Sequence, residues 1–448
     1  MPSGIEILKM LPKTNCGECG LPTCLAFAMN LAAGKAELDS CPHISDEARE
    51  SLSESSAPPI KEVTIGTTDD KVKIGGETVL FRHEKTFFNK TGLGVLITDS
   101  MSDADVDGRI KRLQELKYDR VGLILMAELI AVEATSGDKD KFVALAKKAA
   151  DANPGGIILI STDPTLMGAA LDAIADKKPL IYAATADNSD AMGDLALKHK
   201  CPLGVQADGI DAVAALTEKL TAKGVKDLMI DPMSPNMKKG LEDQTKIRRL
   251  ALKKEKALGF PTIAFPAKMT DNYMKEMLIA SMYVAKYAGI IILSDIQGEG
   301  LFPLLLERLN IYTDPQRPMM TDQGLYPINN PTDDSPLLVT SNFSLTYFIV
   351  SAELEGSRIP SNLLVLDTEG LSVLTAWAAG KFAGDLVAAL MKKLGIKDKM
   401  TIKKVIIPGY VAVISGELEE DLGSDWEVIV GPREAAHIPK FLKDMTGG

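Results

Sequence analysis

Four of the five cysteines lie within the first 41 residues, in the spacing C-x2-C-x4-C-x16-C formed by Cys16, Cys19, Cys24 and Cys41. Four thiolates in one region suit either a tetrahedral zinc ion or an iron–sulfur cluster. Structural zinc sites usually pair their ligands on two short knuckles, whereas here only Cys16 and Cys19 form such a pair and Cys41 stands alone before Pro42. The spacing therefore favours a [4Fe–4S] cluster, with zinc and unliganded core thiols as the alternatives.

Glycines lie beside these cysteines and would let the backbone point amide groups at the sulfurs. Gly17 and Gly20, with Pro22 close by, provide this freedom. A cluster held by four protein thiolates leaves no iron open to substrate, so it would transfer electrons. The fifth cysteine, Cys201, begins an apolar run and is interpreted as a buried small residue.

A second set of polar residues follows short apolar runs in the middle of the chain. These residues are Thr98–Asp99, Ser161–Asp163, Asp187–Asn188, Asp231 and Ser294–Asp295. If the runs are parallel strands of a barrel, the polar residues line the rim at which barrel enzymes place their active sites. Capping of the helices that follow is an equally good interpretation.

The middle of the chain repeats an apolar run followed by a helical stretch. The eight predicted strands are 94–97, 121–126, 156–160, 180–182, 203–205, 228–230, 262–265 and 290–293. Continuous hydrophobicity is typical of parallel strands covered on both faces. Eight strand–helix units predict a TIM (β/α)8 barrel, and a doubly wound open sheet is the alternative.

The length of 448 residues predicts about three domains, and composition shifts suggest where they meet. We predict a small cluster domain at 1–57, a barrel domain at 58–325 and an open α/β (Rossmann-like) domain at 326–448, an α/β multidomain protein overall. Linker-like composition marks 51–59 and 326–336. In the last domain the predicted strands are 337–339, 346–351, 362–366, 405–407, 411–413 and 427–430.

Composition excludes several classes of function. With 50 Lys and Arg against 61 Asp and Glu, the net charge is −11, so there is no positive field to hold nucleic acid or an anionic membrane. Aromatic residues make up only 5%, too few for the stacking platforms of single-strand binders. The first residues lack the pattern of a secretory signal, and no long apolar run is present. We expect a cytoplasmic protein.

The stretch from Cys16 to Ala28, Cys-Gly-Glu-Cys-Gly-Leu-Pro-Thr-Cys-Leu-Ala-Phe-Ala, with Cys41–Pro42, a following barrel and a terminal α/β domain, resembles the large (gamma) subunits of corrinoid iron–sulfur proteins. These belong to the acetyl-CoA decarbonylase/synthase system of anaerobes. The resemblance runs nearly end to end. It implies that Cys16, Cys19, Cys24 and Cys41 bind a [4Fe–4S] cluster and that the C-terminal domain holds a cobamide.

The resemblance also implies a function. The protein would be a component of a corrinoid-dependent methyltransferase system, whose cobalt accepts a methyl group on Co(I) from a methyltetrahydropterin, through a separate methyltransferase, and delivers it to the nickel site of acetyl-CoA synthase. The cluster would reactivate Co(II). Implied partners are a small barrel subunit, the methyltransferase, acetyl-CoA synthase and a reductive activator or ferredoxin. No protein side chain would be catalytic.

A cobamide is large and rich in amides, so its site needs backbone groups and small hydroxyls. Three segments at predicted strand ends provide them, and Gly409–Ala412 is a weaker candidate. The candidate residues are Thr340, Ser341, Asn342, Ser344 and Thr346, then Gly370, Leu371, Ser372, Val373 and Thr375, and finally Gly431, Pro432, Arg433, Glu434 and Ala435. Ordinary caps and turns are the alternative interpretation of these hydroxyls.

The four histidines, His43, His83, His199 and His437, do not form the D-x-H-x-x-G pattern that supplies a lower cobalt ligand in many corrinoid domains. We therefore expect no histidine below the cobalt. Two other functions are left open. The barrel itself could act on a methylpterin through Asp99, Asp163 or Asp231, or the chain could be an electron-transfer module without a corrinoid.

Overall fold

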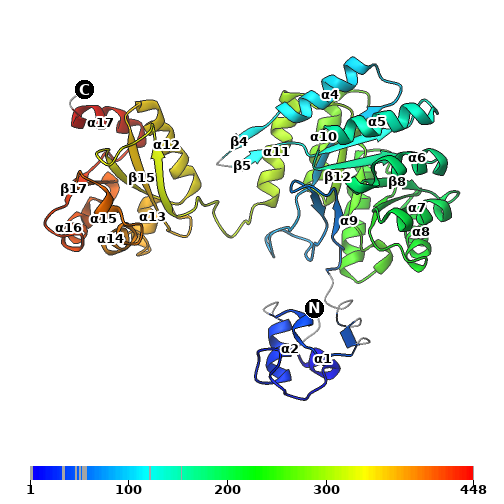
Figure 1. The fold of residues 1–448 in the computed structure, drawn as a ribbon, viewed down its shortest axis with the longest axis horizontal. Coiled ribbons are helices and arrows are strands. Elements are labelled where there is room, and N and C mark those ends of the chain that lie inside the picture. Colours follow the sequence, from blue (N-terminus) through cyan, green and yellow to red (C-terminus); the bar gives the residue numbers. More distant parts are fainter. Residues whose placement is uncertain are drawn as a thin grey trace. The chain divides into compact units, whose positions relative to one another are not determined.

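The computed structural model describes residues 4–32, 36–45, 48–49, 52, 58–120, 123–152 and 154–446. The chain forms two compact units, and Figure 1 shows their folds. One consists of residues 1–80, 88–115 and 127–308 and includes the cysteine segment and the barrel; the other consists of 81–87, 116–126 and 309–448. In the described part of the chain, no helix combines the length and the apolar character needed to cross a bilayer.

The cysteine segment folds around two short helices, α1 (Gly4–Met10) and α2 (Cys24–Ala32), and a 3-10 turn, η1 (Leu38–Ser40). The Thr23 hydroxyl accepts a hydrogen bond from the Ala26 amide and so caps the start of α2. A small core forms between the helices, in which Ile7 and Phe27 are almost fully buried. This arrangement places the first turn of α2, including Cys24, against the core.

The middle of the chain forms a closed eight-stranded parallel barrel, as predicted. In order around the barrel, the strands are β10 (Leu228–Asp231), β11 (Thr262–Ala264), β12 (Ala288–Leu293), β3 (Gly92–Thr98), β6 (Leu129–Glu133), β7 (Gly156–Ile160), β8 (Leu180–Ala184) and β9 (Leu203–Gln206). Helices follow the strands around the outside (Figure 1). They are α4 (Asp103–Glu115), α5 (Lys139–Asp151), α6 (Pro164–Ile174), α7 (Ser189–His199), α8 (Ile210–Ala222), α9 (Met237–Leu252), α10 (Tyr273–Ala285) and α11 (Gly298–Tyr312).

One barrel strand was predicted at the wrong apolar segment of the sequence. Residues 121–126 were expected to be the second strand, but the flanking residues form a separate antiparallel hairpin, β4 (Tyr118–Arg120) with β5 (Leu123–Leu125). The barrel strand is β6, which pairs with β3 and β7. Both runs are apolar, and only the pairing distinguishes them: Leu123 and Ile124 are about half exposed, whereas Leu129–Val132 are buried.

A second hairpin, β1 (Val63–Ile65) with β2 (Val72–Ile74), closes the N-terminal end of the barrel. Ile65 and Ile74 are fully buried against residues from several barrel strands. Close approach requires glycine here, because a Cβ on Gly156 would lie 2.8 Å from the Ile65 side chain. The hairpin leaves the opposite end of the barrel as the one available for ligands.

A buried ion pair fixes the same end. Arg308 on α11 donates to both carboxylate oxygens of Glu128 at 2.8 Å and to the Thr91 carbonyl at 2.8 Å. Burial raises the pKa of Glu128, but the charges of Arg308 and Lys90 outweigh it and hold the pKa below its usual value. Removing Glu128 would leave the buried charge of Arg308 without its carboxylate.

The C-terminal residues form a five-stranded open sheet in the order β13 (Gly324–Ile328), β15 (Ser361–Leu366), β14 (Leu337–Ser341), β16 (Lys404–Ile407) and β17 (Glu427–Val430). All neighbouring strands are parallel except β13, which is antiparallel to β15. Helices cover both faces (Figure 1). On one face lie α12 (Ser344–Ser357) and α17 (Ile438–Thr446), and on the other α13 (Val373–Ala378), α14 (Gly384–Lys393), α15 (Ile396–Lys399) and α16 (Ser415–Leu422).

Two local predictions in this domain were wrong. Residues 346–351 are helical, within α12, and 411–413 lie in the 3-10 helix η5 (Gly409–Ile414). The predicted linker at 326–336 begins within β13, whose residues pair along the edge of the sheet. An isolated bridge between Met320 and Phe343 ties the chain to this domain still earlier. The boundaries at 57 and 325 stay predictions.

Candidate functional site

The four N-terminal cysteines lie in one small domain. Cys24 and Cys41 are buried in the same core cluster, Cys19 packs against it half-buried, and Cys16 is exposed. Asn15 holds Cys24 in place through two hydrogen bonds. The backbone N–H of Asn15 donates to the Cys24 sulfur at 3.4 Å, and the side-chain oxygen of Asn15 accepts from the backbone N–H of Cys24 at 2.8 Å. An amide N–H directed at a thiolate is the contact expected around a metal-bound cysteine.

The backbone around the cysteines adopts the left-handed conformation that the glycines were expected to allow. Gly17 and Gly20 have φ angles of 78° and 80°. Cys16 also lies beside Glu18 and His43, two residues that the cysteine spacing in the sequence did not indicate. The ligand atoms of all three residues are within 4.8 Å of one another, and His43 contacts Glu18 at 2.9 Å. This exposed polar group borders the cysteine cluster.

The described cysteine sulfurs are spread too widely for a preformed zinc site. Around one zinc ion at Zn–S distances of about 2.3 Å, the four sulfurs would lie ~3.8 Å apart. Among the described residues, Cys16, Glu18 and His43 are the only three ligand-type side chains whose atoms meet within 4.8 Å, and no three of the cysteines do so.

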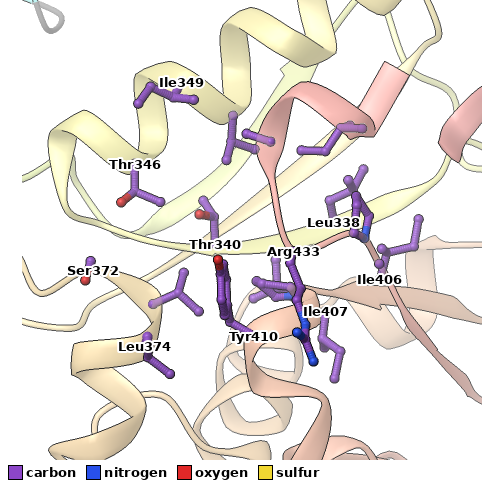
Figure 2. A pocket seen from close by; sticks show the side chains of 18 residues that line it. Leu338, Thr340, Thr346, Ile349, Ser372, Leu374, Ile406, Ile407, Tyr410 and Arg433 are labelled. Atoms are coloured by element: carbon purple, nitrogen blue, oxygen red, sulfur yellow. The ribbon is translucent and has the colours of Figure 1, made fainter. Parts of the chain in front are cut away.

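The C-terminal domain contains an open pocket of about 290 Å³ at the C-terminal ends of its strands (Figure 2). From β14 the chain crosses to β15 on one side, whereas from β16 it crosses to β17 on the other. The connections therefore diverge between β14 and β16, and such a switch point is where open α/β sheets bind ligands. Residues of both strands line this pocket.

All three predicted segments contribute to the pocket, although not with every residue. The predicted residues that line it are Thr340, Thr346, Ser372, Val373, Gly431, Pro432, Arg433 and Ala435. They come from β14, α12, the start of α13 and the loop after β17 (Figure 2). The predicted residues outside the lining are Ser341, Asn342, Ser344, Gly370, Leu371, Thr375 and Glu434.

Thr340 provides a buried polar atom that has no partner within the described part of the chain. The residue is 1% exposed, and its hydroxyl makes no hydrogen bond there. An unmet buried hydroxyl costs free energy unless a bound ligand satisfies it. Its position in the pocket wall therefore fits a ligand with amide groups, such as a cobamide.

Asn342 has a supporting position. Its side-chain oxygen accepts hydrogen bonds from the Thr368 amide and hydroxyl and from the Gly370 amide, at 2.8–3.0 Å, while its own amide donates to Asp367 at 2.9 Å. These bonds shape the loop that leads into Ser372. Asn342 thus positions a wall of the pocket from behind.

Gly370 has a different neighbour from the one expected. The sequence suggested that it leaves room for a ligand, but a Cβ on Gly370 would lie 2.7 Å from Met320 and 3.0 Å from Pro318. The chain entering the domain fills this space. The positive φ of 73° adds a second reason for glycine at this turn.

The rest of the lining is mostly apolar and was not predicted. It includes Leu338, Ile349, Leu374, Ile406 and Ile407. Ile349 and Leu374 are about half exposed, as is Tyr410, whose hydroxyl donates to Glu434 at 2.7 Å. Apolar residues carry no sequence signal that separates pocket lining from core, and of these residues only Tyr410 was suggested beforehand, within the weaker candidate 409–412.

Most polar residues at the barrel rim have structural partners. Asp163 caps α6 by accepting from the Thr165 amide at 2.7 Å. Asp99 accepts four hydrogen bonds from Thr135 and Ser136; burial raises its pKa, but these bonds outweigh the effect and lower it. Asp295 pairs with Arg112 at 2.7 Å. Asp231 differs, because it lines a pocket.

Two protein-family models match the chain. The family described as "Putative Fe-S cluster" matches residues 11–43, which contain all four clustered cysteines. The family described as "CO dehydrogenase/acetyl-CoA synthase delta subunit" matches residues 62–442, covering the barrel and the C-terminal domain. Fold, cysteine segment and these matches together define an iron–sulfur protein of the CO dehydrogenase/acetyl-CoA synthase class.

Relatives matched over the whole chain narrow the assignment. The chain is 45% identical over 98% of its length to the corrinoid/iron-sulfur protein large subunit of Moorella thermoacetica, of which it covers 98%. It is 36% and 35% identical to the acetyl-CoA decarbonylase/synthase complex subunits gamma of Methanopyrus kandleri and Methanothermobacter thermautotrophicus, over 98% and 99% of the chain and 97% and 99% of those proteins. The chain belongs to this family of corrinoid/iron-sulfur protein large subunits, in which the gamma subunits are included.

Proposed function

We propose that this chain is a methyl carrier in which the C-terminal domain binds a cobamide and the N-terminal domain binds a [4Fe–4S] cluster. A cobamide bound there would supply the nucleophilic centre for transfer of a methyl group from a methyltetrahydropterin, through a separate methyltransferase, to the nickel site of acetyl-CoA synthase. The chain works in the cytoplasm as the methyl-carrying component of a methyltransferase system. Its own residues bind and orient the cofactor.

The pocket between β14 and β16 carries this proposal. It lies at the switch point of the sheet, all three predicted segments reach it, and Thr340 presents an unpartnered hydroxyl in its wall. The pocket volume of about 290 Å³ is small for a large cofactor. The pocket therefore takes one part of the cobamide, and the rest of the cofactor lies over the pocket mouth. The half-exposed apolar side chains at that mouth, Ile349, Leu374 and Tyr410, suit contact with a macrocycle.

None of the residues lining the pocket is a histidine. His437 is exposed and outside the lining, although its neighbours Ala435 and Ile438 belong to it. The lining therefore offers no imidazole to a bound cobamide. Electron paramagnetic resonance of the loaded protein in the Co(II) state should show no splitting from a histidine nitrogen, and a nitrogen triplet that is lost in a His437→Ala variant would contradict this part of the proposal.

The cysteine domain supports the second cofactor. Cys16, Cys19, Cys24 and Cys41 would hold the cluster, with the Asn15 amide directed at the Cys24 sulfur. The cluster supplies electrons for restoring oxidised protein, and its four protein ligands keep substrate away from iron. A ferredoxin or reductive activator would deliver those electrons. The remaining partners we propose are the small barrel subunit, the methyltransferase and acetyl-CoA synthase.

Visible spectroscopy of the full chain, purified without oxygen and reconstituted with iron, sulfide and a cobamide, tests the function. We expect cobamide bands together with broad cluster absorption, and methyl transfer only when the separate methyltransferase is added. Cluster absorption without cobamide retention would favour an electron-transfer module. Turnover of a methylpterin with free cobalamin by the chain alone would favour the barrel methyltransferase.

A further inference from the structure

The barrel has a pocket of its own at the end opposite the β1–β2 hairpin. It measures about 180 Å³ and lies where β9, β10 and β11 end. Gln206 and Asp231 come from the ends of β9 and β10, and Phe265 and Lys268 from the residues after β11. This is the face at which TIM barrels bind their ligands. The methyl-carrier function assigns it no role.

Asp231 is the central polar group of this pocket. The residue is 8% exposed, and its carboxylate accepts one hydrogen bond from the Tyr182 hydroxyl at 2.6 Å and one from the Met233 amide at 2.8 Å. Gln206 donates to the Tyr182 oxygen at 2.8 Å and so holds that hydroxyl toward Asp231. A carboxylate has about four acceptor positions, so Asp231 can accept further hydrogen bonds from a ligand.

The charge of Asp231 is only partly balanced by the pocket, where burial raises the pKa of the carboxyl and the nearby charge of Lys268 lowers it without offsetting that burial. Among the described residues, no lysine or arginine forms an ion pair with it. Lys268, in the same wall, contacts Glu133 at 3.3 Å and lies over the Phe265 ring, 4.8 Å from its centre. Burial raises the pKa of Asp231, and the hydrogen bonds from Tyr182 and Met233 offset this effect only in part. The pocket therefore favours a ligand that brings N–H groups.

The walls limit the shape of that ligand. The Phe265 ring packs 4.8 Å from the Tyr182 ring, and Ile263 and Met269 add apolar surface. A volume of about 180 Å³ is below the roughly 300–1,000 Å³ of pockets for drug-sized molecules. A flat ligand of one or two rings fits, with an aromatic face against Phe265 and polar edges toward Asp231 and Gln206.

We propose that the barrel of this chain binds a planar nitrogen heterocycle carrying two adjacent N–H donors, of the cyclic guanidine or amidine type, through Asp231. Two such donors match a carboxylate in a paired, charge-assisted contact. The Gln206 amide and Lys268 are placed to bind the acceptor atoms of the same ring. The proposal concerns binding and assigns no reaction to the barrel.

Two fluorescent bicyclic heterocycles of equal size, pterin and lumazine, test the proposed binding. Pterin presents a 2-amino group next to a ring N–H, whereas lumazine has a carbonyl at that position and lacks the adjacent donor pair. Titrating the full-length protein with each, we expect pterin to bind at least about tenfold more tightly than lumazine. The Asp231→Asn variant should lose at least about tenfold in pterin affinity and none in lumazine affinity, because its amide can donate to the lumazine carbonyl.

Two further variants keep the test decisive. Asp163→Asn makes the same change at the rim but outside the pocket, and should leave pterin binding unchanged, since asparagine also caps helices. If Asp231→Asn does not fold, Met233→Trp replaces it: Met233 is half exposed in the pocket wall, and a larger side chain there should block pterin. The proposal would be overturned if the wild-type protein did not bind pterin up to about 1 mM, or if it bound pterin and lumazine equally. Neither result would affect the methyl-carrier function.

Discussion

Thr340 and Ser341 are neighbours on β14, and both of their hydroxyls are buried and unpartnered in the described structure. Successive side chains of a strand point to opposite faces of the sheet. Leu338 and Thr340 share the face toward α12 and α17, whereas Val339 and Ser341 share the other. Thr340 lines the pocket and Ser341, on the opposite face, does not, which makes the pair a natural comparison.

Replacing Thr340 with Val should weaken cobamide binding by about tenfold, because the bound cofactor loses one hydrogen bond. The protein without cofactor should be as stable as wild type, within ~0.5 kcal/mol, since the lost hydroxyl had no partner. Equilibrium binding and thermal unfolding measure the two effects. Ser341→Ala is the matched control and should leave affinity within about twofold; equal losses in both variants would contradict a specific contact between Thr340 and the cofactor.

Cys19 provides the residue-scale test of the cluster. The wild-type protein should contain about four irons and four sulfides per chain, whereas one zinc without iron would refute the cluster. Cys19→Ala should spare methylation of chemically prereduced protein and block recovery from the oxidised state, because methyl transfer moves no net electron. Cys201→Ala, at a buried cysteine far along the chain, is the control. Equal loss of methylation and recovery in Cys19→Ala would contradict this division.

At the scale of elements, the pocket depends on loops that connect strands to helices. The turn 367–371 between β15 and α13 is held by Asn342, which lies just after β14 and reaches across to it. Ser372 and Val373 follow directly and form part of the pocket wall. The site is thus assembled from neighbouring strands whose ends meet at one edge of the sheet.

The Asn342→Ala variant should destabilise the protein by about 2–4 kcal/mol, because the backbone amides of Thr368 and Gly370 lose their acceptor, whereas the Thr368 hydroxyl keeps the Leu371 carbonyl. Cobamide affinity should fall as well, through loosening of the wall. Hydrogen exchange should rise at 367–371 while the barrel strands stay protected. If exchange in this loop is unchanged, the positioning role of Asn342 is wrong.

For the whole molecule, a carrier must present one cofactor to several partners in turn, so its domain has to move. We predicted the tether at 326–336, but β13 occupies the first part of that segment. Residues 315–318, Pro-Gln-Arg-Pro, are all exposed and follow α11, before the first backbone bridge to the C-terminal sheet. Their side chains are not free of contacts, because Gln316 donates to the His83 carbonyl at 3.0 Å and Pro318 lies beside Gly370. This segment is now the better candidate. The other predicted tether, 51–59, falls largely outside the described residues.

Deleting Gln316 and Arg317 should lower the rates of both methyl acceptance and methyl delivery by about tenfold, because a shorter tether restricts reach. Cobamide content should be unchanged. Inserting two Gly-Ser pairs between these residues lengthens the tether and should retain at least half of the rates. Undiminished rates in the deletion variant would rule out a mobile carrier tethered here.

Much of the architecture could be read from the chain because it depends on local patterns. Repeated apolar runs with helical spacers predicted the barrel, and seven of its eight strands were located. The exception, 121–126, shows the limit: two apolar runs follow one another, and only pairing with β3 and β7 identifies 129–133 as the strand. Likewise 346–351 is apolar enough for a strand but is helical in its tertiary context.

Cysteine spacing and the hydroxyl-rich segments at strand ends were determined by the sequence alone, since both depend on residue type and order. Tertiary structure alone decided which candidates meet. It placed Thr340 in the pocket and Ser341 behind it, turned Asn342 from a ligand candidate into a support, and filled the space at Gly370 with Met320. It also separated Asp231 from the other rim carboxylates. The physical reason is that the direction of a side chain, its hydrogen-bond partners and its close packing contacts depend on residues distant along the chain, which no local sequence pattern contains.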